Sequence, residues 1–256
     1  MSRPALRAII FDLDGTLYDE RGGMQRALDT TLGEASRRLP EFDPERARAL
    51  YPEVGREIWE RANLLGPANP QGATTEDLRR QVWRGVLGAL GHDGIRYDGG
   101  SLADHLAGTY TAARRAGHRL FEDSAPALAR LEQWARPGGL ERIAMITNGP
   151  SDLQREKLSA CGLEGRFDPL IISAEAGRAK PDPGIFLDAV SACGFDPAEV
   201  LYVGDNPALD IGGAKSAGLA AAWVRRLGEA FPGDLPAPDY TIEDLHPLAE
   251  LDWGGR

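Results

Sequence analysis

Short apolar runs punctuate the chain, and each run is closed by turn-forming residues. Runs of this kind predict strands that are buried on both faces of a sheet. Five runs are well defined and a sixth is weaker. The five are Leu6–Phe11, Ile143–Thr147, Pro169–Ser173, Val200–Gly204 and Ala221–Arg225, and the sixth is Tyr240–Ile242.

Helix-like segments lie between the later strands, with apolar positions three and four residues apart. They are Asp152–Cys161, Gly184–Cys193 and Ala208–Ala217. Strands that alternate with helices are typical of a parallel, doubly wound sheet. The sequence therefore predicts an α/β fold with a Rossmann-like core.

The stretch between the first two strands breaks this alternation. It contains no convincing strand pattern, and it is too long for the crossover of a single βαβ unit. Its predicted helices are Met24–Leu39, Pro44–Leu65, Thr75–Leu90 and Ser101–Ala116. We therefore expect a core domain of residues 1–18 and 117–256, with a helical domain inserted at residues 19–116. The last six residues, 251–256, are expected to form a loose tail.

Composition narrows the class of protein. The 256 residues are 42% hydrophobic and 27% charged, which is typical of a globular protein. A net charge of −10 without a basic block argues against nucleic acid or a membrane surface as a partner. No apolar run approaches the length of a membrane-spanning helix, and residues 1–11 lack a signal-peptide cleavage site. Cys161 and Cys193 form no C-x-x-C pair, which favours a reducing, cytoplasmic compartment, and the sequence leaves monomer or dimer open.

Two carboxylates follow the first apolar run. Asp12 and Asp14 are two residues apart, so in a strand they would share one face at a spacing of about 6.6 Å. A hard divalent cation such as Mg²⁺ would relieve their repulsion, and Gly15 would allow a sharp turn. This short pattern alone favours an ordinary turn in which an aspartate caps a helix.

The residues at the ends of the other strands favour a ligand site over an ordinary capping turn. Thr147 and Asn148 offer a hydroxyl and backbone N–H groups beside a helix start, which suits phosphate. Asp205 follows the fourth strand, with Asp210 five residues later, and Lys180 is one of three lysines in an arginine-rich chain. Alone, each could be a capping turn, a solvated acid or a surface lysine. Together, at the strand ends where doubly wound sheets bind ligands, they predict a metal site facing a phosphate site.

These residues resemble a known family. Asp12-Leu-Asp-Gly-Thr16, Thr147-Asn148, Lys180-Pro181 and Gly204-Asp205 with Asp210 are similar to the four motifs of the haloacid dehalogenase-like (HAD) hydrolase superfamily. The helical insert directly after the first motif is similar to the type-1 cap of that family. Two stretches, 146–158 and 175–186, look most like the branch that holds pyrimidine 5′-nucleotidases and the N-acylneuraminate-9-phosphatase.

The resemblance implies a division of labour among the acids. Asp12 would be the nucleophile that forms an aspartyl-phosphate, and Asp14 would be the general acid and then the general base. Asp12, the backbone carbonyl of Asp14, and Asp205 would hold Mg²⁺. The dehalogenase branch lacks the second aspartate, so Asp14 argues against dehalogenation.

The resemblance also implies how the phosphoryl group is held. Thr147 and the Asn148 amide would bind its oxygens, and Lys180 would neutralise charge between it and the nucleophile. The supporting residues would be Gly15, Thr16 and Asp210.

The sequence thus predicts a Mg²⁺-dependent phosphomonoester hydrolase. Its substrate would be a small phosphorylated metabolite, such as a nucleoside monophosphate or a sugar phosphate, and the cap would close over it and select it. Two alternatives stay open. One is a sugar phosphomutase of the same superfamily, and the other is a non-catalytic phosphoryl-receiver module, although such modules are about half this length and lack a helical insert.

Overall fold

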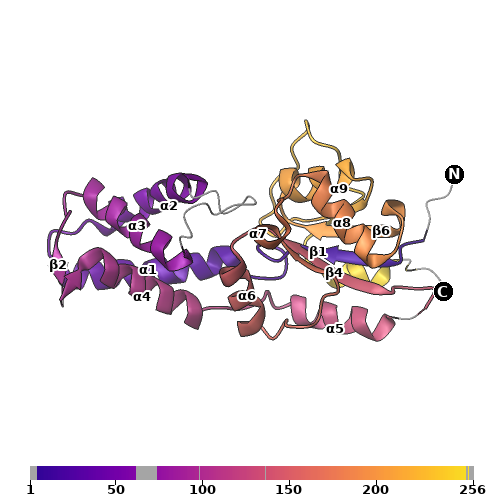
Figure 1. The fold of residues 1–256 in the computed structure, drawn as a ribbon, viewed down its shortest axis with the longest axis horizontal. Coiled ribbons are helices and arrows are strands. Elements are labelled where there is room, and N and C mark those ends of the chain that lie inside the picture. The colour runs from indigo at the N-terminus through magenta and orange to yellow at the C-terminus, as the bar shows by residue number, and fades with distance from the viewer. Residues whose placement is uncertain (1–4, 62–73, 98, 136, 252, 254–256) are drawn as a thin grey trace. The chain divides into compact units, whose positions relative to one another are not determined.

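The computed structural model describes residues 5–61, 74–97, 99–135, 137–251 and 253 (Figure 1). The chain divides into two compact units. One consists of Met1–Asp19 with Arg119–Arg256, and the other is Glu20–His118. Each unit has its own hydrophobic core.

The first unit is built on a six-stranded parallel sheet in the order β5-β4-β1-β6-β7-β8. Its strands are β1 (Ala8–Phe11), β4 (Arg142–Thr147), β5 (Leu170–Ile172), β6 (Val200–Gly204), β7 (Ala220–Val224) and β8 (Tyr240–Ile242). All six lie in the predicted runs, with small shifts at their ends. The predicted doubly wound α/β fold is confirmed.

Both faces of the sheet are covered, which is why its strands are apolar almost throughout. In β1, Ile9 and Phe11 enter one core, whereas Ala8 and Ile10 enter the other. The elements that contribute to the first core are α5 (Ser124–Trp134), α6 (Ser151–Ala160) and η3 (His246–Glu250). Those that contribute to the second are α8 (Pro183–Cys193), η2 (Pro207–Gly212) and α9 (Gly213–Ser216). Figure 1 shows α5, α6, α8 and α9 around the sheet, together with the short α7 (Ser173–Ala176).

The strand order places a topological switch beside β1. After β1 the chain builds β4 and β5 on one side, and it then crosses to β6 on the other side. Phe11 is in register with Met145 of β4 and with Val203 of β6. The residues that follow these three strands therefore emerge together, at the edge where open α/β sheets bind ligands.

Two local expectations for this unit need correction, and one helix was not predicted. The predicted helix at 208–217 is divided into the π-helical turn η2 and the short α9. The third strand stops at Ile172, because Ser173 already begins α7. Helix α5 was not predicted. It contains Pro126, but this proline lies in the first turn, where its missing N–H costs no helical hydrogen bond, so it is compatible with the helix.

The expectation of a loose C-terminal tail is wrong at Trp253. Its side chain is only 3% exposed and packs in the core with Leu245 and Leu248. The indole Nε1 also donates a hydrogen bond of 2.9 Å to the Leu248 carbonyl. A single aromatic residue between glycine and aspartate carries no periodic signal, so the sequence pattern missed this anchor.

The second unit consists mainly of helices. Its helices are α1 (Glu20–Arg38), α2 (Pro44–Arg61), α3 (Thr75–Ala89) and α4 (Leu102–Ala116). The predicted end of the second helix, at residues 62–65, lies outside the described residues. The expectation of no strand is wrong, because β2 (Arg96–Tyr97) pairs with β3 (Gly100–Ser101), but two residues are too few to give a strand pattern.

Side-chain caps formed by residues close in sequence mark the starts of two of these helices, α3 and α4. Thr74 and Asp77 form a capping box at the start of α3, and Ser101 accepts a hydrogen bond from the Asp104 backbone at the start of α4. Arg114 is almost fully buried, and its Nη2 contacts both carboxylate oxygens of Glu20, at 2.7 and 2.8 Å.

Throughout the described part of the chain, helices that combine the length and apolarity needed to cross a membrane are absent.

Candidate active site

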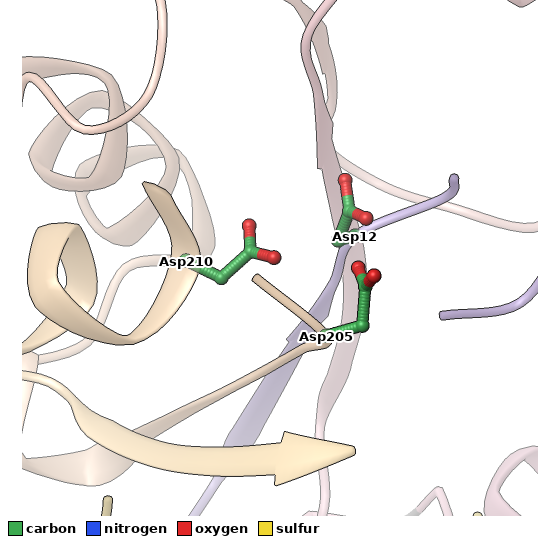
Figure 2. Close-up of side chains that lie close together, drawn as sticks. All are labelled: Asp12, Asp205 and Asp210. Carbon is green, nitrogen blue, oxygen red and sulfur yellow. The ribbon is translucent and has the colours of Figure 1, made fainter. Parts of the chain in front are cut away.

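Three carboxylates meet at the carboxyl edge of the sheet. Asp12 follows β1, Asp205 follows β6, and Asp210 lies in η2, with one oxygen from each within 4.8 Å of the others (Figure 2). Asp12 and Asp210 are buried, and Asp205 is half-buried. The hydroxyl of Thr16 lies 3.4 Å from Asp12 Oδ2 and 3.3 Å from Asp205 Oδ1, so it links two of the acids.

Two glycines make room for these acids. Gly15 has φ +86°, and a Cβ at this position would lie 2.3 Å from Asp205 Oδ2. A Cβ at Gly204 would lie 2.4 Å from Asp210 Cγ. A Cβ at either position would force the neighbouring aspartate to move, so the observed arrangement of the acids depends on both glycines.

Lys180 lies within this group. Its Nζ lies 2.5 Å from Asp12 Oδ1, 2.7 Å from Asp210 Oδ1 and 2.9 Å from the Tyr202 hydroxyl, so all three ammonium protons have an acceptor. Burial works against a charge on Lys180, but the carboxylates of Asp12 and Asp210 outweigh it and raise the pKa of this lysine above its ordinary value. The ammonium is therefore retained, although the side chain is almost fully buried.

The electrostatics of the acids favour a further positive charge at this site. Burial raises the pKa of Asp12, Lys180 opposes this rise, and the charges of Asp210 and Asp205 add to it. Burial and the charge of Asp210 raise the pKa of Asp205 to about 7. Three acids face a single lysine, so a divalent cation would balance the excess negative charge, and carboxylate oxygens are the donors that Mg²⁺ prefers.

The side chain of Asn148 holds the backbone of Lys180 in place. Its Nδ2 donates to the Lys180 carbonyl, and its Oδ1 accepts from the Lys180 N–H, both at 3.0 Å. These two hydrogen bonds connect the residue that follows β4 to the loop between α7 and α8, which contains Lys180. The backbone of Asp205 is held in a similar way, because Trp223 Nε1 donates to its carbonyl at 2.8 Å.

The Asp14 side chain contacts two residues of helix α6. Its carboxylate pairs with Lys157 Nζ at 2.7 and 2.9 Å and accepts from Gln154 Nε2 at 2.9 Å. Gln154 Nε2 also lies within hydrogen-bonding range of the Thr147 hydroxyl and, at 3.1 Å, of the Asn148 carbonyl, so its two protons are shared among three acceptors. The residues expected from the sequence thus form two linked groups, one around Lys180 and one around Asp14.

The sequence analysis missed Tyr202, Gln154 and Lys157. Tyr202 lies inside a buried strand, where the sequence pattern cannot distinguish it from an ordinary core residue. Lys157 could have been found by the argument used for Lys180, because it is another of the three lysines in this arginine-rich chain. A glutamine within a helix gives no sequence signal that would mark Gln154 as a site residue.

The fold and these strand ends define a class: an α/β protein with an acidic and cationic site at the switch point of a parallel sheet. The family model of the haloacid dehalogenase-like hydrolases matches residues 6–218. The chain belongs to this family, so the predicted family and enzyme class, a hydrolase, are confirmed.

Individual relatives agree with this assignment. The chain is 34% identical to a phosphoserine phosphatase of Thermus thermophilus, over 94% of this chain and 96% of the relative. It is 26% identical to the N-acylneuraminate-9-phosphatase of Rattus norvegicus, over 98% and 95% of the two chains. Its fold also matches the crystal structure of a 2-haloacid dehalogenase from Pseudomonas syringae, with a TM-score of 0.63 and 27% identity over 96% of this chain and 97% of that one.

Proposed function

We propose that the protein is a Mg²⁺-dependent phosphomonoesterase that works through a phosphorylated Asp12. The observation that carries this proposal is the position of Lys180, which is buried against Asp12 and Asp210 beside a third acid, Asp205. A nucleophile that attacks a phosphate dianion needs positive charge at its side, and Lys180 provides a fixed part of it. Membership of a hydrolase family removes the non-catalytic receiver alternative.

The donor set fits a divalent cation. Asp12, Asp205 and the backbone carbonyl of Asp14 would hold Mg²⁺, with Asp210 as support. When bound, Mg²⁺ would supply the positive charge that stabilises the phosphoryl oxygens in the transition state. The excess of three carboxylates over one lysine supports this assignment.

The chain's own residues divide the reaction into two steps. In the first, an Asp12 oxygen attacks phosphorus, the bond to the substrate oxygen breaks, and Asp14 protonates the leaving oxygen. In the second, Asp14 takes a proton from water, the water oxygen attacks phosphorus, and phosphate and free Asp12 are released. The first step needs an acid and the second a base close to the nucleophile, and Asp14, which follows Asp12 by two residues, could serve as both.

Thr147 and Asn148 would bind the phosphoryl oxygens. The Thr147 hydroxyl accepts a hydrogen bond from Gln154, which leaves its own proton available for a phosphoryl oxygen. The side chain of Asn148 is engaged by Lys180, so the backbone amide is the group that it would offer.

The substrate would be a small phosphorylated metabolite. Nucleoside monophosphates and sugar phosphates are candidates from the sequence, and the names of the relatives add phosphoserine and N-acylneuraminate 9-phosphate. The helical unit Glu20–His118 would act as the cap that selects among them. Two unpaired thiols, Cys161 and Cys193, support a reducing, cytoplasmic compartment.

The test is phosphate release from a panel of these compounds with and without Mg²⁺, for the wild type and for Asp12→Asn. We expect Mg²⁺-dependent release that Asp12→Asn abolishes, because an amide cannot serve as the nucleophile. Full activity in Asp12→Asn would contradict the proposal. Isomerisation of a hexose phosphate without phosphate release would favour the mutase, and halide release from a 2-haloacid would favour a dehalogenase.

A further inference from the structure

One face of helix α6 buries two polar side chains that the proposed reaction does not use directly. Gln154 is 1% exposed and Lys157 is 2% exposed. They are three residues apart, so they share one face of the helix. Lysine is rarely buried to this extent unless its charge is compensated, so a specific partner is expected.

That partner is the Asp14 carboxylate. Lys157 Nζ contacts both of its oxygens, and Gln154 Nε2 donates to Oδ2. Three donor contacts fix a group that would otherwise rotate about its side-chain bonds. Lys157 also lies 5.3 Å from the centre of the Tyr18 ring, which helps to hold the ammonium in place.

The amide of Gln154 is oriented by its surroundings. Nε2 faces three acceptors: Asp14 Oδ2, the Thr147 hydroxyl and the Asn148 carbonyl. Reversing the amide would place Oε1 against a carboxylate and a carbonyl, so the observed orientation is the favourable one. It leaves Oε1 buried without a hydrogen-bond partner in the described structure, which is an unfavourable arrangement for a group with only a packing role.

We propose that Gln154 and Lys157 are positioning residues that align the proton-transfer group Asp14 with the phosphate-binding hydroxyl of Thr147. This inference rests on the proposed function, because it assigns the proton steps to Asp14. A single Gln154 nitrogen joins the two groups, so the proton donor and the phosphoryl oxygens would keep a fixed separation. Lys157 prevents the carboxylate from turning out of this position.

A positioning role predicts a dependence on the leaving group. An alkyl phosphate needs a proton on the departing oxygen, whereas p-nitrophenyl phosphate departs as a stable anion and needs little help. Disordering Asp14 should therefore slow the first step for alkyl phosphates far more than for aryl phosphates. A general loss of folding would lower both rates equally and leave their ratio unchanged.

The experiment measures kcat/KM for an alkyl phosphate and for p-nitrophenyl phosphate in the Mg²⁺-loaded full chain, because kcat/KM reports on the first irreversible step. In Lys157→Met and Gln154→Met, we expect the alkyl-to-aryl ratio to fall by about 10- to 100-fold, as part of the general-acid contribution is lost. Lys157→Arg should recover part of the ratio. Arg155→Met is the matched control, because Arg155 lies on the same helix but pairs with Glu175 at the surface.

Asp14→Asn separates the inference from the proposed function. A selective loss in Asp14→Asn, with no further loss on adding Lys157→Met, would support both. No leaving-group selectivity in Asp14→Asn would contradict the role of Asp14 in the proposed function. Selectivity in Asp14→Asn, with unchanged or increased alkyl-to-aryl ratios in Lys157→Met and Gln154→Met, would overturn the inference alone.

Discussion

The hydroxyl of Tyr202 lies 2.9 Å from Lys180 Nζ and 3.0 Å from Asp210 Oδ1, so it completes the set of acceptors around the buried ammonium. Burial and the charge of Asp210 raise the pKa of this tyrosine well above its ordinary value, so its proton is retained. The tyrosine therefore acts as a neutral bridge that holds Lys180 and Asp210 together without adding charge.

Removing this bridge should weaken the site while leaving the core packed. In Tyr202→Phe the ring keeps its edge contact with Phe186, whose centroid is 5.0 Å away, but Lys180 and Asp210 each lose a hydrogen bond. We expect the free energy of unfolding to fall by about 1–3 kcal/mol and kcat to fall by about tenfold. Urea titration and steady-state kinetics measure the two effects, with Tyr240→Phe on β8 as the control. Wild-type kinetics in Tyr202→Phe would show that the hydroxyl does not position Lys180.

Gly15 should be irreplaceable for steric reasons. An alanine there would force Asp205 to move, in addition to the strain of a positive φ. Gly194→Ala is a matched control, because Gly194 has φ +81° and open space around its Cβ position. We expect both variants to lose about 1 kcal/mol or more of stability, and only Gly15→Ala to lose activity, by about 100-fold. Equal activity losses in the two variants would indicate that backbone strain, and not displacement of Asp205, is responsible.

Mg²⁺ should stabilise the folded chain independently of turnover. A ligand that binds only the native state at about 100 times its Kd adds about 2.7 kcal/mol to the free energy of unfolding. After treatment with a chelator, adding Mg²⁺ should raise the midpoint of thermal unfolding, and the rise should be much smaller in Asp205→Asn. The exposed Asp234 provides the control Asp234→Asn, which should respond like the wild type. A Mg²⁺ response that survives Asp205→Asn would place the cation elsewhere.

The helical unit should lose an ionic contribution in acid. Hydrogen bonds from His105, Arg37 and Arg38 lower the pKa of Glu34 to about 2, from an ordinary value of 4.5. Because the folded pKa is the lower one, the stabilisation is complete above the unfolded value and is lost as the pH falls toward the folded one.

Urea titrations of the wild type and Glu34→Gln test this directly. The difference in the free energy of unfolding between them should be full at about pH 5.5 and should shrink steadily toward about pH 3. Glu57→Gln is the control, since Glu57 pairs with Arg61 on an exposed surface. A difference that stays constant across this range would contradict the assigned contacts of Glu34.

The sequence predicted the sheet because burial on both faces left a continuous apolar run in each strand, as in β1 (Ala8–Phe11). It predicted Asp12, Lys180 and Asp205 as candidates because parallel strands all deliver their following residues to one edge. These are consequences of local pattern combined with one topological rule.

Other features depend on contacts that no local pattern encodes. The pairing of Lys157 with Asp14 joins residues 143 positions apart and depends on which face of α6 meets the strand ends. The burial of Trp253 likewise depends on a core cluster whose members come from many parts of the chain. The β2–β3 pair could not be predicted for another reason, because two residues per strand are too few to show the alternation of a strand.

The central claim, that Asp12 carries the phosphoryl group, is tested most directly by rapid acid quenching of the Mg²⁺-loaded enzyme during turnover, followed by peptide mass spectrometry. The account predicts that the peptide containing Asp12 gains the mass of one phosphoryl group, located on Asp12 by fragmentation. It also predicts that the added mass is absent from Asp12→Asn and from samples without substrate. Turnover with no phosphorylated Asp12 under conditions that preserve acyl phosphates, or a phosphoryl group on another residue that forms and decays at the turnover rate, would contradict it.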